Sequence, residues 1–510
     1  MKKRELIFKI ELTAGVLIFV LLIFYTNLFH YNYKMNADIG SEAVLGELIW
    51  KSKQVLPDTW YPSTEARIIS TPNIAALFYG MTGNMILSMG LACCFMTVLI
   101  VAGMWFFCKK ANMKGIHCSL AIFLGLAIPT DFTFLELVYV FAGYYAIQTA
   151  VLFFTLGIYI ESMDEGRVKY GWFLAGLVAA LLLGFQGMRG ILVLYGPLLG
   201  IELVRRIYYL YNCQEKPGGW TISLWVLLLL AFSFAGSCFP FSASQNISRN
   251  IRKGIARLFT TVLPDMGKIL GFGSTHIISQ ICMSVFALLA LYTVFEVLLR
   301  LLKKGRVESA EWAYLVIFVS PFVTAFIVAF TTVESTPRYY FMLIYAIAFS
   351  AARMWGEKHL LSLLISVAAL ILAFTNIYQV YMPACRSTEP PLTDAYKVVG
   401  YLEECNIGIA YTDFENANAM TALSNGKIRI APVASTAKMD ICKWLSSTTW
   451  YPPNQPYECV TAYIITDAKE DEFKQFIIGK TENIRKAEEF GKYKVYISNY
   501  NYANLGEEQR

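Results

Sequence analysis

The chain has 510 residues, of which 56% are hydrophobic and only 16% are charged, and its mean hydropathy is +0.49. Soluble domains carry about a quarter charged residues, so this composition excludes an ordinary soluble protein. The apolar residues form stretches of about twenty, the length that crosses roughly 30 Å of hydrocarbon, and they predict a polytopic α-helical membrane protein. The net charge of +6 is modest, and Lys and Arg gather at segment ends, which indicates orientation rather than nucleic-acid binding.

The N-terminal segment predicts a retained span over about 6–30, because its apolar core is too long for a signal peptide and no small-residue cleavage site follows. Lys2, Lys3 and Arg4 place the N-terminus in the cytoplasm. Ten more spans, which bring the expected number to eleven, are predicted at about 82–107, 116–129, 138–160, 171–185, 191–204, 220–237, 276–301, 313–331, 340–354 and 359–378.

Two long segments, 31–80 and 239–275, are predicted to be outer loops. In the first, Asp38 and Glu42 lie four residues apart where a short helix begins, so both carboxylates can face the same side. Leu45, Leu48 and Ile49 then form an apolar stripe, as in a helix that lies along a membrane surface. A polar loop of this length and content is typical of a functional segment rather than a connector.

The second outer loop carries basic residues at 247–257, an exception to the rule that positive charge stays inside. Basic residues on the outer side favour an anionic substrate, with Arg252 as one candidate ligand. A solvated face or a face toward lipid headgroups is the alternative interpretation.

From residue 382 to 510 the apolar runs shorten to strand length. Helices are expected at 393–404, 415–424 and 469–478, and strands at 406–414, 427–433, 462–467 and 492–500. This alternation predicts a small extracytoplasmic α/β domain, while residues 1–381 form the membrane domain. If the small domain lies outside the cell, disulfides are possible among Cys385, Cys405, Cys442 and Cys459. The cysteines lack CxxC spacing and the histidines are dispersed, so no metal site is assigned.

Several charged groups face the outer side in this topology. Asp38, Glu42 and Asp131 are candidate catalytic carboxylates, since proton abstraction needs a positioned base. Arginines stabilise the charge on a leaving phosphate through their planar fork of donors. The candidate substrate- and phosphate-binding residues are Arg189, Arg338, Tyr339, Arg67 and Arg252.

Each candidate also has a structural interpretation. Asp38 and Asp131 are good helix caps, and Glu42 fits a solvated helix face. Arg189 could extend from a hairpin between spans to the membrane interface, and Arg338 with Tyr339 could form an interfacial anchor. Glu65 and Arg67 are most simply a local surface ion pair that contributes little energy.

The layout resembles the GT-C superfamily of integral membrane glycosyltransferases, which includes protein O-mannosyltransferases and the aminoarabinose transferases that modify lipid A. The resemblance rests on Asp38 in NADIGSE, Asp131 in PTDFTF, Arg338 and Tyr339 in STPRYYFML, and the C-terminal soluble domain. WYPSTEARI and TALSNGKIRI are similar to segments of bacterial proteins with this layout. The first loop has DIGSE in place of the adjacent Asp-Glu or Asp-x-Asp pair of many members, which leaves the acceptor, the metal requirement and activity itself open.

The resemblance implies inverting transfer of a sugar from a polyprenyl-phosphate donor to a cell-envelope acceptor at the outer face of the plasma membrane. Asp38 would be the general base, and Arg338 with Arg189 would hold the phosphate; no covalently bound cofactor and no nucleic acid is implied. A transporter or lipid flippase is the first alternative, although no inverted repeat is evident and the polar groups gather at one face. A non-catalytic protein that binds lipid-linked glycans is the second.

Overall fold

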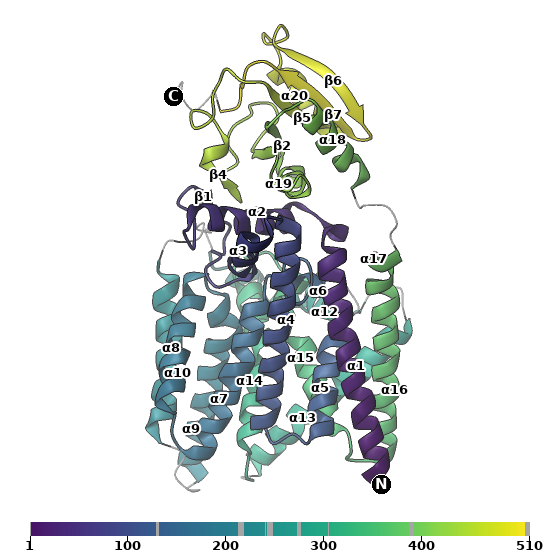
Figure 1. Ribbon diagram of the computed structural model, residues 1–510. Helices are drawn as coiled ribbons and strands as arrows, with labels where there is room; N and C mark the ends of the chain where they lie inside the picture. Colours follow the sequence, from purple (N-terminus) through teal and green to yellow (C-terminus); the bar gives the residue numbers. More distant parts are fainter. Residues whose placement is uncertain are drawn as a thin grey trace.

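The structure is a computed structural model that describes residues 2–128, 132–212, 219–239, 241, 248–272, 277–303, 305–386 and 392–504. Long helices lie side by side in a bundle, and a domain that contains a β-sheet covers one end of it (Figure 1). The prediction of a polytopic α-helical membrane protein with a small C-terminal α/β domain is therefore confirmed.

A helix occupies each predicted span. These helices are α1 (Lys2–Phe29), α4 (Met85–Lys110), α5 (Gly115–Ala127), α7 (Ala146–Glu165), α8 (Tyr170–Phe185), α9 (Gly196–Asn212), α10 (Trp220–Ser237), α13 (Ile277–Leu302), α14 (Ser309–Phe330), α15 (Met342–Met354) and α16 (His359–Asn376). Within the described ranges, seven helices are long and apolar enough to cross a membrane, and two more, Gly115–Ala127 and Tyr170–Phe185, are apolar but shorter. The chain is thus a multi-pass membrane protein, and eleven crossings stays a prediction.

The fourth span begins later than predicted, because α7 starts at Ala146 and not near residue 138. The short helix α6 (Phe132–Val138) precedes it, followed by a buried turn in which Phe141 and Gly143 have positive φ angles of 60° and 57°. Asn27 donates to the Tyr139 carbonyl at 3.0 Å and accepts from the Phe141 amide at 3.0 Å. Non-helical backbone is tolerated in an apolar setting when protein groups satisfy its polar atoms, as here.

The sixth span is longer than predicted. The π-helix η2 (Ile191–Tyr195) continues into α9, which ends at Asn212. Arg205 and Arg206 near the end of this helix are buried, and both bind the buried carboxylate of Glu202, at 2.7 and 3.1 Å. Because both guanidinium groups are paired with Glu202, the helix can continue past them without bringing them to the aqueous surface.

The first predicted outer loop folds into η1 (Tyr31–Lys34), α2 (Ala37–Ser52), β1 (Trp60–Tyr61) and α3 (Thr71–Thr82), which lie between the bundle and the C-terminal domain (Figure 1). The expected helix exists as α2, but its apolar side meets protein rather than lipid. Val44, Leu45 and Ile49 are buried, and α2 packs against α3, α4 and α19 (Phe414–Leu423). The second outer loop contains α11 (Ile251–Arg257), η3 (Leu258–Val262) and α12 (Leu263–Ile269).

The C-terminal domain is built on a five-stranded sheet with strand order β3-β2-β5-β7-β6. Its elements are α18 (Thr393–Glu404), β2 (Ile409–Asp413), α19, β3 (Arg429–Val433), β4 (Ser446–Ser447), β5 (Thr461–Thr466), α20 (Glu470–Phe476), β6 (Ile484–Phe490) and β7 (Tyr493–Ser498). Strand β2 is parallel to β3 and β5, and β7 is antiparallel to β5 and β6. The sequence missed β6 because it is an edge strand of mostly exposed charged residues, with only Ile484 buried.

The division at residue 382 stays a prediction, since α17 (Met382–Arg386) continues the helical path of α16 and η5 (Ile377–Tyr381). Cys385, Cys405, Cys442 and Cys459 are free thiols in the structure, so the disulfides considered from the sequence are not formed.

The C-terminal domain docks on the bundle through backbone and charged contacts. Strand β1 pairs antiparallel with β4, with Trp60 opposite Ser447. Arg429 donates to the buried carboxylate of Glu47 at 2.7 Å, and the side chain of Asn425 accepts from the amide of Met85 at 2.8 Å. These contacts fix the domain over α2 and the start of α4.

The two parts approach each other closely at Gly40 of α2. A Cβ atom there would lie 2.5 Å from the Ala419 nitrogen of α19, which is backbone and cannot rotate away. We expect Gly40→Ala to loosen the docking and lower the melting temperature by several degrees, because overpacking of this kind costs roughly 1–3 kcal/mol. Gly171→Ala is the control, since Gly171 has open space around it. Equal melting temperatures for the two variants in a thermal-shift measurement would contradict the tight packing.

Candidate active site

A cavity of about 120 Å³ lies where the bundle, the first loop and the C-terminal domain meet. Parts of the chain far apart in sequence line it. The lining residues are Asp38, Ser41, Glu42, Ser63, Thr64, Glu65, Arg67, Tyr144, Tyr145, Arg189, Arg338, Tyr339, Trp444 and Leu445.

Four of the charged side chains at this cavity form a continuous chain of ion pairs. Arg67 donates through Nε to Glu42 at 2.7 Å and lies 3.3 Å from Glu65 through Nη1. Arg189 donates through Nε to the other oxygen of Glu65 at 2.6 Å. All four side chains are at most 17% exposed, so alternating charges compensate one another in a largely dry setting.

The backbone around these groups is held by the hairpin that follows α8. The buried Gln186 accepts from the amides of Ile68 and Ile69, both at 3.3 Å, and so ties the first loop to the hairpin. Gly187, with φ of 125°, adopts a conformation that L side chains rarely reach. The turn directs Arg189 over the ring of Tyr145, 3.8 Å from its centroid, a cation–π contact that fixes the guanidinium further.

Asp38 and Arg338 are the charged residues at the cavity that take no part in this chain. Both side chains are exposed, and neither has an ion pair within 4.0 Å among the residues that the structure describes. Asp38 lies in the first turn of α2, and Arg338 lies on η4 (Pro337–Tyr340), where its guanidinium is 5.9 Å from the centroid of Tyr339. The cavity therefore presents one carboxylate and one guanidinium to a ligand.

The buried carboxylates have shifted pKa values of opposite sign. Burial raises the pKa of Glu42, although the adjacent Arg67 opposes the shift. Burial also acts to raise the pKa of Glu65, but Arg189 and Arg67 together outweigh it and hold that pKa below its usual value. Glu65 is thus an ionised group that organises two arginines.

Most of the site residues expected from the sequence lie at this one cavity. These are Asp38, Glu42, Arg67, Arg189, Arg338 and Tyr339. Asp131 lies outside the described residues. Arg252 does not line the cavity; it is exposed on α11, the helix whose Arg257 binds the carbonyls of Thr331 and Val333, the latter at 2.7 Å. The basic segment is therefore anchored to the end of α14 rather than turned into the cavity.

Three structural interpretations are wrong. Asp38 is not the cap of its helix, because Asn36 is the N-cap and accepts from the Ile39 amide at 2.8 Å. Glu42 is buried rather than solvated. Glu65 and Arg67 do pair, but in a mostly buried network rather than on an open surface.

Sequence reasoning missed two contributions to the site. Glu136 on α6 lies close to Asp38, and burial followed by the charge of Asp38 raises its pKa. The sequence signal for Glu136 was its position in PTDFTFLEL, in the same segment as Asp131. Trp444 and Leu445 reach the cavity from the C-terminal domain, and only the docking of that domain reveals their place. Within the described ranges, no group of three His, Cys, Asp or Glu side chains is arranged to hold a metal ion.

The apolar helices, the first loop against the end of the bundle and the C-terminal α/β domain make up a membrane fold that two solved structures share. ArnT from Cupriavidus metallidurans, bound to undecaprenyl phosphate, matches with a TM-score of 0.57 and 12% identity over 95% of this chain and 98% of ArnT. The oligosaccharyltransferase of Archaeoglobus fulgidus, in complex with zinc and sulfate, matches with a TM-score of 0.51 and 11% identity over 88% of this chain and 67% of the enzyme.

At these identities the likeness establishes the fold, which is the one expected from the sequence. No protein-family model matches the sequence, and no curated protein matches it.

Proposed function

We propose that the protein is a glycosyltransferase that moves a sugar from a polyprenyl-phosphate donor to a cell-envelope acceptor at the extracytoplasmic face of the plasma membrane. The observation that carries the proposal is the pairing pattern at the cavity, where Asp38 and Arg338 face a ligand and the other charges compensate one another. The likeness in fold to ArnT, a structure bound to undecaprenyl phosphate, supports the choice of donor class.

In the proposed reaction the acceptor hydroxyl gives its proton to the Asp38 carboxylate as its oxygen attacks the anomeric carbon. The bond from that carbon to the phosphate oxygen breaks, and the polyprenyl phosphate leaves with the electron pair. Attack on the face opposite the phosphate inverts the anomeric configuration. Charge that develops on the phosphate is stabilised by Arg338, which has no carboxylate partner to neutralise it among the described residues.

The ion-pair chain has a supporting role in this proposal. Glu65 holds Arg189, whose guanidinium also lies 5.4 Å from the ring centroid of Tyr339. The chain thus positions Tyr339, next to Arg338, and keeps the walls of the cavity rigid before substrate arrives. The ionisable groups of this cavity lie at one end of the bundle, which fits an enzyme better than a transporter, whose polar groups gather near the bilayer midplane.

The direct test is transfer of radiolabelled sugar from undecaprenyl-phosphate donors to a cell-envelope extract by the purified full-length chain in nanodiscs. A panel of donors that differ in the sugar is needed, and label in the acceptor fraction is the expected result. Binding of the donors with no transfer from any of them, to any acceptor fraction, would contradict the enzymatic role.

Replacing Arg338 tests the phosphate contact. We expect Arg338→Gln to weaken the binding of undecaprenyl phosphate about tenfold or more, because a charge-assisted hydrogen bond to an anion contributes roughly 1.5–3 kcal/mol. Arg252→Gln is the matched control, since Arg252 is also an exposed arginine in an outer segment but does not line the cavity. Binding measured by microscale thermophoresis that falls equally in both variants would show that only general surface charge matters.

A further inference from the structure

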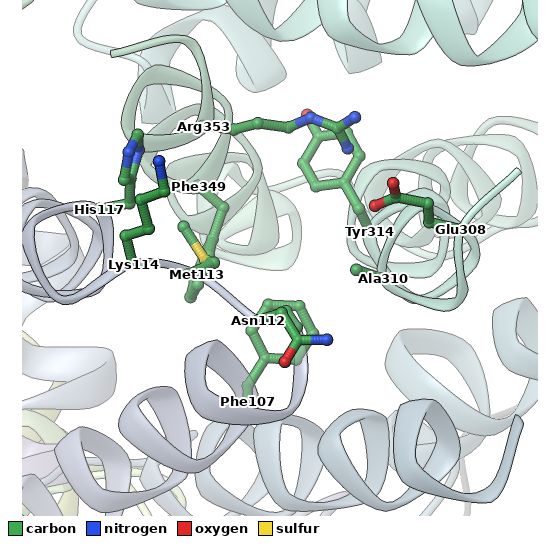
Figure 2. Close-up of a pocket in the computed structure, with 11 residues that line it drawn as sticks. Phe107, Asn112, Met113, Lys114, His117, Glu308, Ala310, Tyr314, Phe349 and Arg353 are labelled. Atoms are coloured by element: carbon green, nitrogen blue, oxygen red, sulfur yellow. The ribbon is translucent and has the colours of Figure 1, made fainter. Parts of the chain in front are cut away.

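A second cavity has a volume of about 260 Å³ (Figure 2). The turn between α4 and α5, which lines it, lies at the end of the bundle away from the C-terminal domain (Figure 1). The turn between α4 and α5 forms one side of it, and the start of α14 and the end of α15 form the other. Its lining residues are Phe107, Ala111, Asn112, Met113, Lys114, His117, Glu308, Ala310, Tyr314, Phe349 and Arg353. The proposed glycosyl transfer makes no use of this cavity.

One part of the wall is polar and cationic. Figure 2 shows Lys114 and His117 close together on one side, with Arg353 extending across the cavity from the neighbouring helix. His117 is fixed there by a hydrogen bond between Nδ1 and the Ala352 carbonyl, at 2.7 Å. Lys114 is exposed and has no ion pair within the described part of the chain. It is the cation best placed to receive a ligand.

Neither of the acidic residues nearby pairs with Lys114 in the described part of the chain. Glu311 is fully buried and binds two arginines, Arg300 at 2.5 Å and Arg353. Glu308 is the residue before α14, and its amide donates to the Glu311 carboxylate at 3.0 Å. Glu311 is held by the two arginines, and neither Glu308 nor Glu311 forms an ion pair with Lys114 among the described residues, so the positive charge of Lys114 can attract an anion.

The remainder of the wall is apolar and aromatic. Phe107 and Phe349 meet edge to face with ring centroids 5.0 Å apart, and Met113 and the ring of Tyr314 continue the surface. The hydroxyl of Tyr314 is hydrogen-bonded to Ser350, so Tyr314 presents the carbon atoms of its ring to the cavity. A cationic rim beside an apolar wall at a membrane surface fits a ligand with an anionic head and a hydrocarbon tail, as in basic pockets that take anionic lipid headgroups.

We propose that this cavity binds the phosphate of an anionic phospholipid, with Lys114 and Arg353 at the phosphate and the tail against Phe107 and Phe349. A free phosphoryl anion shares the same headgroup chemistry, and the two sources differ in whether the apolar wall contributes. The site lies at the opposite end of the bundle from the candidate active site, so it is independent of the proposed sugar transfer.

The test uses the delipidated full-length chain in a neutral detergent and three soluble probes: dihexanoyl phosphatidic acid, dihexanoyl phosphatidylcholine and inorganic phosphate. Affinities are measured by the shift in melting temperature across a concentration series. We expect phosphatidic acid to bind at least five times more tightly than phosphatidylcholine, and Lys114→Gln to weaken it about fivefold. Lys114 is exposed, so its replacement does not threaten the fold.

Lys109→Gln is the matched control, because Lys109 is an exposed cation at the same end of the bundle that contacts Trp105 and does not line the cavity. Its affinity for phosphatidic acid is expected to equal that of the unmodified chain. If inorganic phosphate binds as tightly as phosphatidic acid and depends on Lys114 to the same extent, the site binds an anion. A lipid is then not its specific occupant. Equal affinity for the two lipids, or equal effects of the two lysine variants, would overturn the proposal.

Discussion

Replacing Asp38 with asparagine is expected to slow sugar transfer at least a hundredfold while the binding of undecaprenyl phosphate stays unchanged. The amide has nearly the shape of the carboxylate but cannot accept the acceptor's proton, and general-base catalysis contributes roughly 10²–10⁴-fold. Asn36 rather than Asp38 caps α2, so the variant keeps its helix start. Initial rates with a radiolabelled undecaprenyl-phosphate sugar, and the affinity for undecaprenyl phosphate in the same preparation, provide the two readouts.

Asp58→Asn is the control for this variant. Asp58 is an exposed carboxylate of the same first loop, and its partner is Gln54 at 2.7 Å, away from the cavity. We expect it to transfer sugar at the unmodified rate. If Asp38→Asn transfers sugar at that same rate, Asp38 is not the general base. If Asp38→Asn loses donor binding together with transfer, the carboxylate acts in binding.

Replacing Glu65 with alanine is expected to destabilise the protein by about 3–5 kcal/mol, the cost of breaking a buried pair and leaving its partner uncompensated. Glu65 binds both Arg189 and Arg67, and neither guanidinium is more than 17% exposed. Thermal unfolding of the full chain followed by tryptophan fluorescence measures the loss. The same variant is expected to lose sugar transfer, because Arg189 no longer holds its place beside Tyr339.

The control is Glu403→Ala, which removes a carboxylate from an exposed pair with Lys427, 3.4 Å away. Surface pairs contribute about 0–1 kcal/mol, so this variant is expected to melt close to the unmodified chain. If Glu65→Ala is no less stable than Glu403→Ala, the ion-pair chain does not hold the site together.

The pH dependence gives the Glu65 variant an independent readout. The pKa of Glu65 is lower in the folded chain than its ordinary value of 4.5, so ionised Glu65 favours the folded state. Its contribution is fully present above pH 4.5 and is lost as the pH falls through the lowered folded pKa. Glu65→Gln has no such group, and its stability is therefore expected to fall less steeply over this acid range.

The sequence predicted the membrane helices well because hydrocarbon imposes a length and a composition that can be read residue by residue. Residues 138–145 are as apolar as a span and were predicted to begin one, but they are buried by other helices, and Asn27 satisfies their backbone. Strand β6 was missed for the converse reason, since an edge strand needs no apolar face. Hydropathy indicates whether the surroundings of a segment are apolar or polar. Other parts of the protein can provide those surroundings in place of lipid or water.

The candidate site was predictable as a set of residues but not as a network. Topology alone brings Asp38 and Arg338 to the same end of the bundle, because each falls just outside a span on the predicted outer side. The partners of Arg67 and Arg189 could not be deduced, since a local pair of Glu65 with Arg67 was the simplest interpretation of the sequence. Arg252 was included for its charge, and its helix is turned elsewhere by the contacts of Arg257.

A structure of the full-length chain with undecaprenyl phosphate, determined by cryo-electron microscopy in nanodiscs, would show whether the cavity at Asp38 and Arg338 holds the donor phosphate. We expect phosphate density against Arg338, with the Asp38 carboxylate facing it across the cavity and the prenyl chain running toward the bilayer. Phosphate bound at another place on the chain, with no contact to Arg338 and the cavity closed to lipid, would rule out this binding site.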